Sequence, residues 1–317
     1  MNWECFSLLN TRLKQTLDAG IFAITSEIGP PRGTDSDFII ERTKLIADYC
    51  DAINVTDNVG GVPTMSSTAS ARLVLDAGGE PILQLSTRDR NRIAIESELY
   101  GAYALGIRNV LFITGDRTIM GAHSDAKLVF DMDSIQALRF TSHLMEGIDF
   151  DGEELQGKPE FFMGATFNPF AESIEMEILR TKQKKDAGAQ FFQTQAVFDT
   201  LAFETFVDRI RDLELKILVG IIALRGPKNA RFMNVNVPGI KIPEEYIKRL
   251  ESAGKGLKDD EERDAMRNEG LLIASETIKV IRNIKGIAGL HLMGIGREES
   301  IPDLVKLAGL SSRRKLG

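Results

Sequence analysis

The feature that most constrains the fold is an eightfold alternation of short apolar, β-branched runs with longer stretches of helical periodicity. Strands that are separated by helices pair in parallel, and eight such strands are the number that closes a sheet on itself. The sequence therefore predicts one (β/α)8 TIM barrel. The strand candidates are FAITSEI (22–28), AINVTD (52–57), PILQLS (81–86), NVLFITGD (109–116), FFMGATFN (161–168), FFQTQAVF (191–198), KILVGIIAL (216–224) and GLHLMGIG (289–296).

The segments between these strands carry the signals of amphipathic helices. Residues 172–188 end at Gly188, where a C-cap glycine is expected, and a long helix over 259–284 opens with two acids. No linker rich in Gly, Ser or Pro divides the chain. We therefore expect a single domain over residues 1–317, with an N-terminal helix within 1–20 and a frayed tail at 311–317.

An open, doubly wound sheet is the alternative architecture for the same alternation. That fold normally has a glycine-rich turn after its first strand, where backbone N–H groups bind a phosphate. Here Gly29-Pro30-Pro31 follows the first strand and offers few N–H groups, and neither GxGxxG nor GxxxxGK[ST] is present. The barrel is therefore favoured over the open sheet.

Composition and charge exclude several classes of function. The net charge is −7, whereas nucleic acids and anionic membranes require a positive face. No apolar run reaches the roughly 18 residues that cross a bilayer. Cys5 and Cys50 are too few for a disulfide framework, and free cysteines favour a reducing cytoplasm. The three histidines lack metal-ligand spacing, so no metal site is predicted.

Polar side chains stand at the C-terminal ends of seven of the eight strand candidates. In a barrel these ends face one shared pocket. Each residue also has a structural explanation, because acids cap helices, glutamines occur as paired core amides, and an arginine can pair with acids of the next helix. The convergence of the set on one rim favours a site. Its members are Glu27, Thr56, Asp57, Gln84, Asp116, Asn168, Gln195 and Arg297, and Arg225 follows the seventh strand.

The chemistry of this set is selective. It contains carboxylates, amides and a threonine, but no Ser–His–Asp or Cys–His set and no lysine within a strand for a Schiff base. Such a set suits a site in which a bound cofactor supplies the difficult step. The protein would then contribute general acid catalysis and hydrogen bonds. Glu27, the only charge in its strand, is the candidate acid, and Pro30 and Pro31 fix the exit of the chain beside it.

An ordered set of motifs resembles the methylenetetrahydrofolate reductase family over nearly the whole chain. Single motifs are weak, but their order and spacing are specific to the catalytic barrel of that family. The segments RDRN and FDMDS are most similar to bacterial and archaeal members, including those of acetogens. The motifs are TSEIGPPRG (25–33), NVTDN (54–58), LQLSTRDRNR (83–92), FITGDR (112–117), FDMDS (130–134), GATFNPF (164–170), KKDAGAQFFQTQ (184–195) and MGIGR (293–297).

The resemblance implies a flavin-containing TIM barrel that reduces 5,10-methylenetetrahydrofolate to 5-methyltetrahydrofolate. Glu27 would protonate folate N10 as the five-membered ring opens, and the resulting iminium would accept hydride from reduced flavin. Asp116 would lie by the flavin and bind the pterin, Gln195 would contact the pterin, and Arg297 would bind substrate. The implied cofactor-binding residues are Thr56, Gln84, Gly115, Asp116, Asn168, Glu177, Arg180, Lys184 and Ala189.

The resemblance also implies the cofactor and partners. FAD is the expected flavin, and FMN is the alternative because Asn168, Glu177 and Arg180 differ from enterobacterial members. The electron donor would be NADH, NADPH or a separate partner subunit with zinc or iron–sulfur, and an oligomer is expected. The pathways implied are methionine biosynthesis and the Wood–Ljungdahl pathway. Two other functions stay open, a folate-binding methyltransferase-type barrel and a non-catalytic folate-binding subunit.

Overall fold

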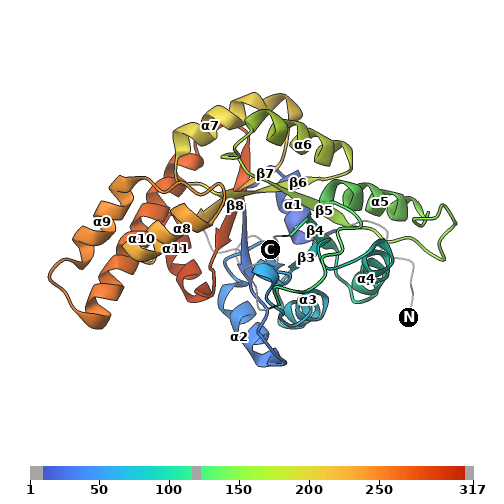
Figure 1. Cartoon of the computed structure of the whole chain (residues 1–317), viewed down its shortest axis with the longest axis horizontal. Coiled ribbons are helices and arrows are strands. Elements are labelled where there is room, and N and C mark those ends of the chain that lie inside the picture. Colours follow the sequence, from blue (N-terminus) through green and yellow to red (C-terminus); the bar gives the residue numbers. More distant parts are fainter. Residues whose placement is uncertain (1–9, 116–122, 311–317) are drawn as a thin grey trace.

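Eight parallel strands form a closed barrel in a computed structural model that describes residues 10–115 and 123–310 (Figure 1). The barrel closes between the first and last strands, where Thr25 lies opposite His291. The predicted (β/α)8 barrel is confirmed, and the open-sheet alternative is wrong. The strands are β1 (Ala23–Ile28), β2 (Ala52–Val55), β3 (Pro81–Ser86), β4 (Asn109–Ile113), β5 (Phe162–Phe167), β6 (Phe191–Ala196), β7 (Ile217–Ile222) and β8 (Ile287–Met293).

Helices surround the barrel and bury their apolar faces against it (Figure 1). The α-helices are α1 (Arg12–Asp18), α2 (Ser36–Ile46), α3 (Ser67–Asp76), α4 (Arg92–Ala104), α5 (Ser134–Glu146), α6 (Ile174–Asp186), α7 (Thr200–Arg209), α8 (Pro227–Asn236), α9 (Glu244–Gly254), α10 (Asp259–Ile281) and α11 (Ile301–Leu307). Short 3-10 turns occur at η1 (Val59–Gly61), η3 (Arg211–Leu213) and η4 (Glu298–Ser300). The expected C-cap glycine of α6 is present, because Gly188 follows that helix with φ +106.

Local sequence explains where many of these helices begin. A side-chain oxygen of the residue before the helix accepts a hydrogen bond from an N–H group of the first turn, which would otherwise lack a partner. At α5, Asp133 and Gln136 form a reciprocal capping box, with Asp133 Oδ1 accepting from the Gln136 N–H at 2.9 Å. Single caps of the same kind are Asp35 at α2, Ser66 at α3, Asn91 at α4 and Asp199 at α7.

The interior of the barrel is stacked in layers, because alternate residues of each strand point inward. The lowest layer is apolar and packs against Leu13 and Leu17 of α1, which closes the N-terminal end. In that layer Phe162 and Phe191 stack with ring centroids 5.0 Å apart. Gly164 makes room for this pair, since a Cβ there would lie 2.3 Å from the Phe191 ring. The layer above is polar and leads to the C-terminal face.

The connection between β7 and β8 is larger than the sequence analysis predicts. It contains α8 and α9 as well as the expected long helix α10, which ends at Ile281 rather than 284. These helices bury a separate apolar cluster that includes Met233, Leu250 and Ile273. α9 and α10 pack side by side and extend away from the barrel (Figure 1). The predicted tail 311–317 and the first nine residues of the expected N-terminal helix lie outside the described residues.

Candidate active site

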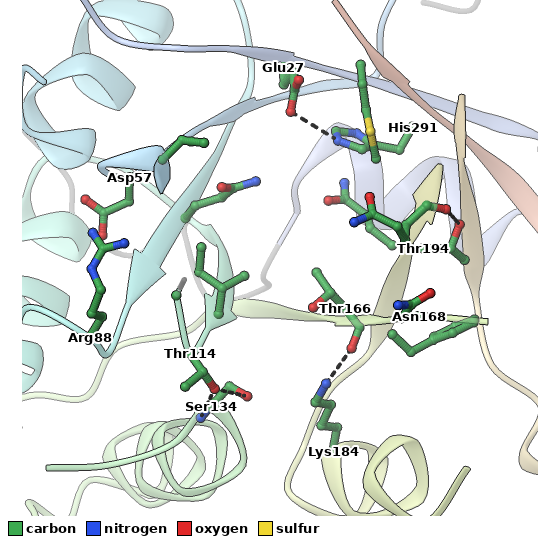
Figure 2. Close-up of a pocket in the computed structure, with 18 of the residues that line it drawn as sticks. Glu27, Asp57, Arg88, Thr114, Ser134, Thr166, Asn168, Lys184, Thr194 and His291 are labelled. Atoms are coloured by element: carbon green, nitrogen blue, oxygen red, sulfur yellow. Dashed lines mark hydrogen bonds and ion pairs between the residues drawn. The ribbon is translucent and has the colours of Figure 1, made fainter. Parts of the chain in front are cut away.

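A cavity of about 500 Å³ opens at the C-terminal ends of the strands. Figure 2 shows its lining side chains converging from opposite sides of the barrel. Besides Asp57, eight of the residues named from sequence line it: Glu27, Gln84, Gly115, Asn168, Glu177, Arg180, Lys184 and Gln195. Asp57, the strand-end acid, lines it as well. Parallel strands that point the same way therefore bring together side chains that are far apart in the chain.

Three other candidates lie elsewhere, and a fourth cannot be placed. Thr56 and Ala189 are buried but do not line this cavity. Arg297 lines a neighbouring cavity of about 290 Å³ together with Arg225 and Arg267. The two cavities share Met293 as a lining residue, so they adjoin. Asp116 lies outside the described residues.

Glu27 lies near the end of β1 and faces the cavity. Its side chain is 18% exposed, and its Oε2 atom lies 3.7 Å from Nε2 of the buried His291 (Figure 2). The carboxyl group is thus held at the lip of a buried strand with access to a ligand in the cavity. This geometry suits a group that exchanges a proton with a bound molecule, since the acid must reach its target atom.

The opposite wall of the cavity carries positive charge from α6. The Lys184 Nζ donates a hydrogen bond to the Thr166 carbonyl oxygen at 2.5 Å (Figure 2). Burial lowers the pKa of Lys184 below the ordinary lysine value, and the Arg180 charge lowers it further, whereas Glu177 opposes both. Arg180 also pairs with Asp133 at 3.7 Å, so the two cations of this wall lie beside two acids, and a bound anion would compete with those acids for Lys184 and Arg180.

Glu177 also shapes the loop after β5. Its Oε1 atom accepts a hydrogen bond from the Asn168 backbone N–H at 2.8 Å, and Asn168 Oδ1 accepts from the Phe170 N–H at 3.0 Å. These bonds hold the loop against the N-terminal turn of α6. Both side chains are therefore committed to the shape of the cavity wall as well as lining it.

Gln195 reaches the cavity from an irregular part of β6. The pairing of β6 with β7 shifts register between Gln193 and Ala196. Gln195 Oε1 accepts a hydrogen bond from the Ala196 N–H at 3.1 Å, which leaves the amide NH₂ group to donate elsewhere. Such irregularities re-aim side chains next to functional sites.

Gly115 lines the cavity directly after β4, where the backbone lies close to Ser86 and Arg88. Its φ is +88, and a Cβ at this position would lie 2.3 Å from Ser86 Oγ and 3.0 Å from Arg88 Cβ. Only glycine fits both the backbone conformation and the contact. At Gly115 the chain therefore presents main chain, rather than a side chain, to a ligand.

Arg88 and His291 are cavity residues that the sequence analysis did not select. Arg88 is 2% exposed and donates to Asp89 Oδ2 at 2.6 Å and to the Asn58 carbonyl oxygen at 2.9 Å. In sequence it belongs to the charged run TRDRNR, which is typical of an exposed loop. His291 stands in an apolar strand as a single histidine, which is usually a core residue. Only the motif LQLSTRDRNR pointed toward Arg88.

Asp57 has a structural role at the same rim. Its Oδ2 atom accepts from the Ser86 N–H at 2.8 Å and from Arg90 at 2.5 Å. Both partners belong to the end of β3 and the loop that follows, so Asp57 fixes β2 to β3 at the cavity. Among the described residues, no group of three or more His, Cys, Asp or Glu side chains is arranged to hold a metal ion. Within the same residues, no helix is both long enough and apolar enough to cross a membrane.

These features define a TIM-barrel protein with a cavity at the C-terminal face of the barrel that is a candidate ligand site. A family model described as methylenetetrahydrofolate reductase matches residues 12–309. The chain therefore belongs to the methylenetetrahydrofolate reductase family.

Curated relatives agree with this assignment. A probable methylenetetrahydrofolate reductase (NADPH) of Caenorhabditis elegans is 24% identical over 96% of this chain and 45% of its own length. Methylenetetrahydrofolate reductase (NADH) 1 of Arabidopsis thaliana is 26% identical over 96% of this chain and 51% of its own. The Escherichia coli 5,10-methylenetetrahydrofolate reductase is 26% identical over 61% and 58%. The chain thus spans about half the length of these relatives.

A solved structure shows the same fold. An uncharacterized protein from Clostridium thermocellum superposes with a TM-score of 0.64 at 17% identity, over 93% of this chain and 97% of that protein. That protein binds two copies of 5-methyl-5,6,7,8-tetrahydrofolic acid. At this level of identity the likeness concerns the fold alone.

Proposed function

We propose that this chain is a flavin-dependent reductase of 5,10-methylenetetrahydrofolate that forms 5-methyltetrahydrofolate. The observation that carries the proposal is Glu27, a carboxyl group at the lip of a cavity whose other walls offer amides and cations. Family membership gives the substrate class, and the folate-binding structural neighbour supports it. The side chains Glu27, Gln84, Gln195 and Lys184 then act on one bound pair of molecules.

The residues of the cavity fit a flavin. A flavin has a planar ring with polar edges and a chain that ends in phosphate. Gly115 offers close main-chain approach, Gln84 offers an amide, and Arg180 and Lys184 offer positive charge for phosphate. We assign the ring to the side of Gly115 and the phosphate to α6. When bound, the flavin supplies the hydride.

Glu27 supplies the proton in this proposal. Opening of the five-membered ring needs a proton on folate N10, and Glu27 is the acid that faces the cavity from β1. The amide of Gln195 orients the pterin, and Arg297 in the adjoining cavity binds the distal part of the substrate. Asp116, which follows the cavity-lining Gly115 in sequence, keeps its proposed role beside flavin and pterin. Asn168 and Glu177 line the proposed cofactor site, and contacts of Thr56 and Ala189 with the cofactor stay a prediction from the resemblance.

The remaining assignments are also proposals. FAD is the expected flavin and FMN the alternative. NADH, NADPH or a partner subunit that contains zinc or iron–sulfur delivers the electrons. We place the protein in the cytoplasm as an oligomer, in one-carbon metabolism that feeds methionine biosynthesis or the Wood–Ljungdahl pathway.

Glu27→Gln tests the acid role. Reduced protein is mixed with methylenetetrahydrofolate, and reoxidation of the flavin is followed by absorbance. We expect Glu27→Gln to slow this step by about 10²–10⁴-fold, the usual contribution of a general acid. Reduction of the flavin by an artificial donor should be unchanged. Glu41→Gln, an exposed glutamate on α2, is the matched control and should behave as wild type.

Other outcomes would contradict the proposal. A purified protein that is colourless and takes up neither FAD nor FMN would exclude a flavin enzyme. Loss of both half-reactions in Glu27→Gln would exclude a specific acid role. Methyl transfer without a redox change would indicate the methyltransferase-type barrel. A Glu27→Gln protein that keeps every measured activity would indicate a binding subunit.

A further inference from the structure

A row of buried polar side chains crosses the barrel interior directly below Glu27. Asn54 and Gln193 exchange two amide hydrogen bonds, of 2.7 and 2.9 Å. The Gln193 Nε2 also donates to Thr25 Oγ1 at 3.3 Å, and Thr25 Oγ1 lies 3.0 Å from Nδ1 of His291. All four side chains are at most 3% exposed. The row therefore runs from β2 through β6 and β1 to β8, and ends at the histidine that faces Glu27.

The hydrogen bonds of the Thr25 hydroxyl determine which nitrogen of the His291 imidazole carries a proton. A threonine hydroxyl donates one hydrogen bond and accepts two. Thr25 donates its proton to the Leu290 carbonyl oxygen at 3.2 Å and accepts from Gln193. Only its second lone pair is left for the imidazole. With the hydroxyl proton on the side of Leu290, Nδ1 of His291 carries a proton and donates it to Thr25 Oγ1 at 3.0 Å.

This leaves Nε2 of His291 facing Oε2 of Glu27 at 3.7 Å. If both atoms lacked a proton, a nitrogen lone pair would face a carboxylate in a buried site, which is unfavourable. Of the two strands beside β8, β1 supplies Glu27, and β7 places Gly220 opposite His291. The charge that acts on His291 from these strands is thus that of Glu27.

We propose that Glu27 and His291 hold one exchangeable proton between them, and that the row Thr25–Gln193–Asn54 locks His291 in the form that makes this necessary. His291 is then a positioning residue that keeps a proton available to Glu27. The inference rests on the proposed acid role of Glu27. Contact between the pair requires Glu27 to move by about 1 Å, because a hydrogen bond needs roughly 2.7–3.2 Å.

The proton balance is simple. In the loaded pair the proton is on Oε2 of Glu27 or on Nε2 of His291. During the reaction the Glu27 O–H bond breaks and the folate N10–H bond forms, which leaves a carboxylate and a neutral imidazole. A proton from water then reloads the pair. The proton on Nδ1 stays with Thr25 throughout, and no electron is transferred in this step.

The simpler structural interpretation predicts the opposite tautomer. If the Thr25 hydroxyl donated to Nδ1 instead, His291 would carry its proton on Nε2 and donate to an ionised Glu27. The pair would then have no extra proton to give. The position of the proton on the imidazole therefore distinguishes the two interpretations.

Nitrogen-15 NMR of histidine-labelled protein measures this directly. The chain has three histidines, and His291→Gln identifies the signal of interest. We expect a protonated Nδ1 in wild type and in Thr25→Ser, and its loss in Thr25→Val, which has nearly the same shape but no hydroxyl. A wild-type His291 with its proton on Nε2 alone would overturn the proposal.

Kinetics give the second readout. Thr25→Val should slow flavin reoxidation by methylenetetrahydrofolate by about tenfold or more, a part of the usual general-acid effect, whereas Thr25→Ser should stay within about threefold of wild type. Dithionite reduction of the flavin should not change in either variant. Equal rates for Val and Ser would overturn the positioning role.

A third variant tests the proposal in case the Thr25→Val protein does not fold. His291→Asn keeps an N–H donor toward Thr25 but lacks Nε2, so we expect a slow folate step with normal flavin binding. A normal folate step in His291→Asn would contradict the proposal. If the wild-type protein does not react with methylenetetrahydrofolate at all, the proposed function fails, and the NMR result still decides the tautomer.

Discussion

At the scale of single residues, two glycines with nearly the same φ differ in their surroundings. Comparing them distinguishes the cost of backbone strain from the cost of a steric contact. Gly115 has φ +88 and lies against Ser86 and Arg88, whereas Gly78 has φ +86 and would have nothing within 4 Å of an added Cβ. An alanine at Gly78 is therefore strained only in its backbone. An alanine at Gly115 must also displace the cavity wall.

We expect Gly78→Ala to lower the free energy of unfolding by about 1 kcal/mol and Gly115→Ala to lower it by a further 1–3 kcal/mol, roughly the cost of overpacking. Gly115→Ala should also weaken flavin binding, because the added methyl group must displace Ser86 and Arg88, and Arg88 lines the cavity. Chemical denaturation and flavin titration check both effects. Equal destabilisation by the two variants would show that the contact at Gly115 is unimportant.

Lys184 gives a prediction about pH. Burial lowers its folded-state pKa, so the side chain loses its charge at a lower pH than an ordinary lysine. If Lys184 binds the flavin phosphate, affinity for FMN or FAD falls as pH rises through this lowered pKa. Lys184→Met should bind about 10- to 100-fold more weakly at neutral pH, the worth of a hydrogen bond to a charged group, and lose this pH dependence.

Fluorescence titration of flavin at several pH values measures this dependence. Lys182→Met is the matched control, because Lys182 lies on the same helix and is exposed. It should keep the affinity and the pH profile of wild type. An unchanged profile in Lys184→Met would place the phosphate elsewhere.

At the scale of elements, the N-terminus of α1 depends on one partly buried acid, Glu80. Glu80 oxygens accept hydrogen bonds from the first backbone N–H groups of α1, at Arg12 and Leu13, and from Asn109. A carboxylate at a helix N-terminus is favourable, and it holds α1 across the floor of the barrel. Burial nevertheless raises the pKa of Glu80, because it disfavours the charged form more than these bonds stabilise it.

The raised pKa of Glu80 determines whether its contribution to stability rises or falls with pH. The folded state binds the Glu80 proton more readily than the unfolded state, so this contribution to stability is present at acidic pH and is lost as pH rises through the folded pKa. Glu80→Gln has no such titration. The stability of wild type relative to Glu80→Gln should therefore fall as pH rises above the ordinary glutamate pKa and through the raised folded pKa, by about 1.4 kcal/mol per unit of pKa separation.

Urea unfolding at each pH measures the difference. The exposed Glu41→Gln serves again as control and should run parallel to wild type. Parallel curves for Glu80→Gln and wild type would show that Glu80 has the same pKa in both states. Loss of the α1 packing alone would shift the whole curve without changing its slope.

At the scale of the whole molecule, the cavity is made by closure of the barrel. It joins Glu27 of β1 to His291 of β8 and to Lys184 of α6, so no single segment contains the site. A ligand that fills it therefore contacts most strands at once. Such a ligand should stabilise the whole barrel, because it binds the folded chain and not the unfolded one.

We expect FAD or FMN at 100 times its Kd to stabilise the fold by about 2.7 kcal/mol. Thermal unfolding with and without ligand measures the rise in Tm. Riboflavin has the same ring but no phosphate, so at equal concentration it should stabilise less. Equal stabilisation by riboflavin would mean that Lys184 and Arg180 do not bind the phosphate.

Much of this architecture could be predicted from the sequence. The eight strands lie within a few residues of their predicted positions, because a buried parallel strand is a short apolar run that can be recognised locally. α8 and α9 were missed because their apolar positions are few, and only the tertiary structure shows that these positions join Ala196 of β6 and Ile222 of β7 in one cluster. Of the candidate rim, Glu27, Gln84 and Gln195 line the cavity, and their roles in a site stay predictions.

Sequence alone was enough for the eightfold alternation, the C-cap glycine Gly188 and the position of Glu27 at a strand end, since each depends on residues close together in the chain. Only the tertiary structure showed that Arg88 is buried, that Arg297 lies in a second cavity, and that His291 faces Glu27. The reason is distance along the chain. Thr25 and His291 are 266 positions apart and meet only because β1 pairs with β8, which no local pattern encodes.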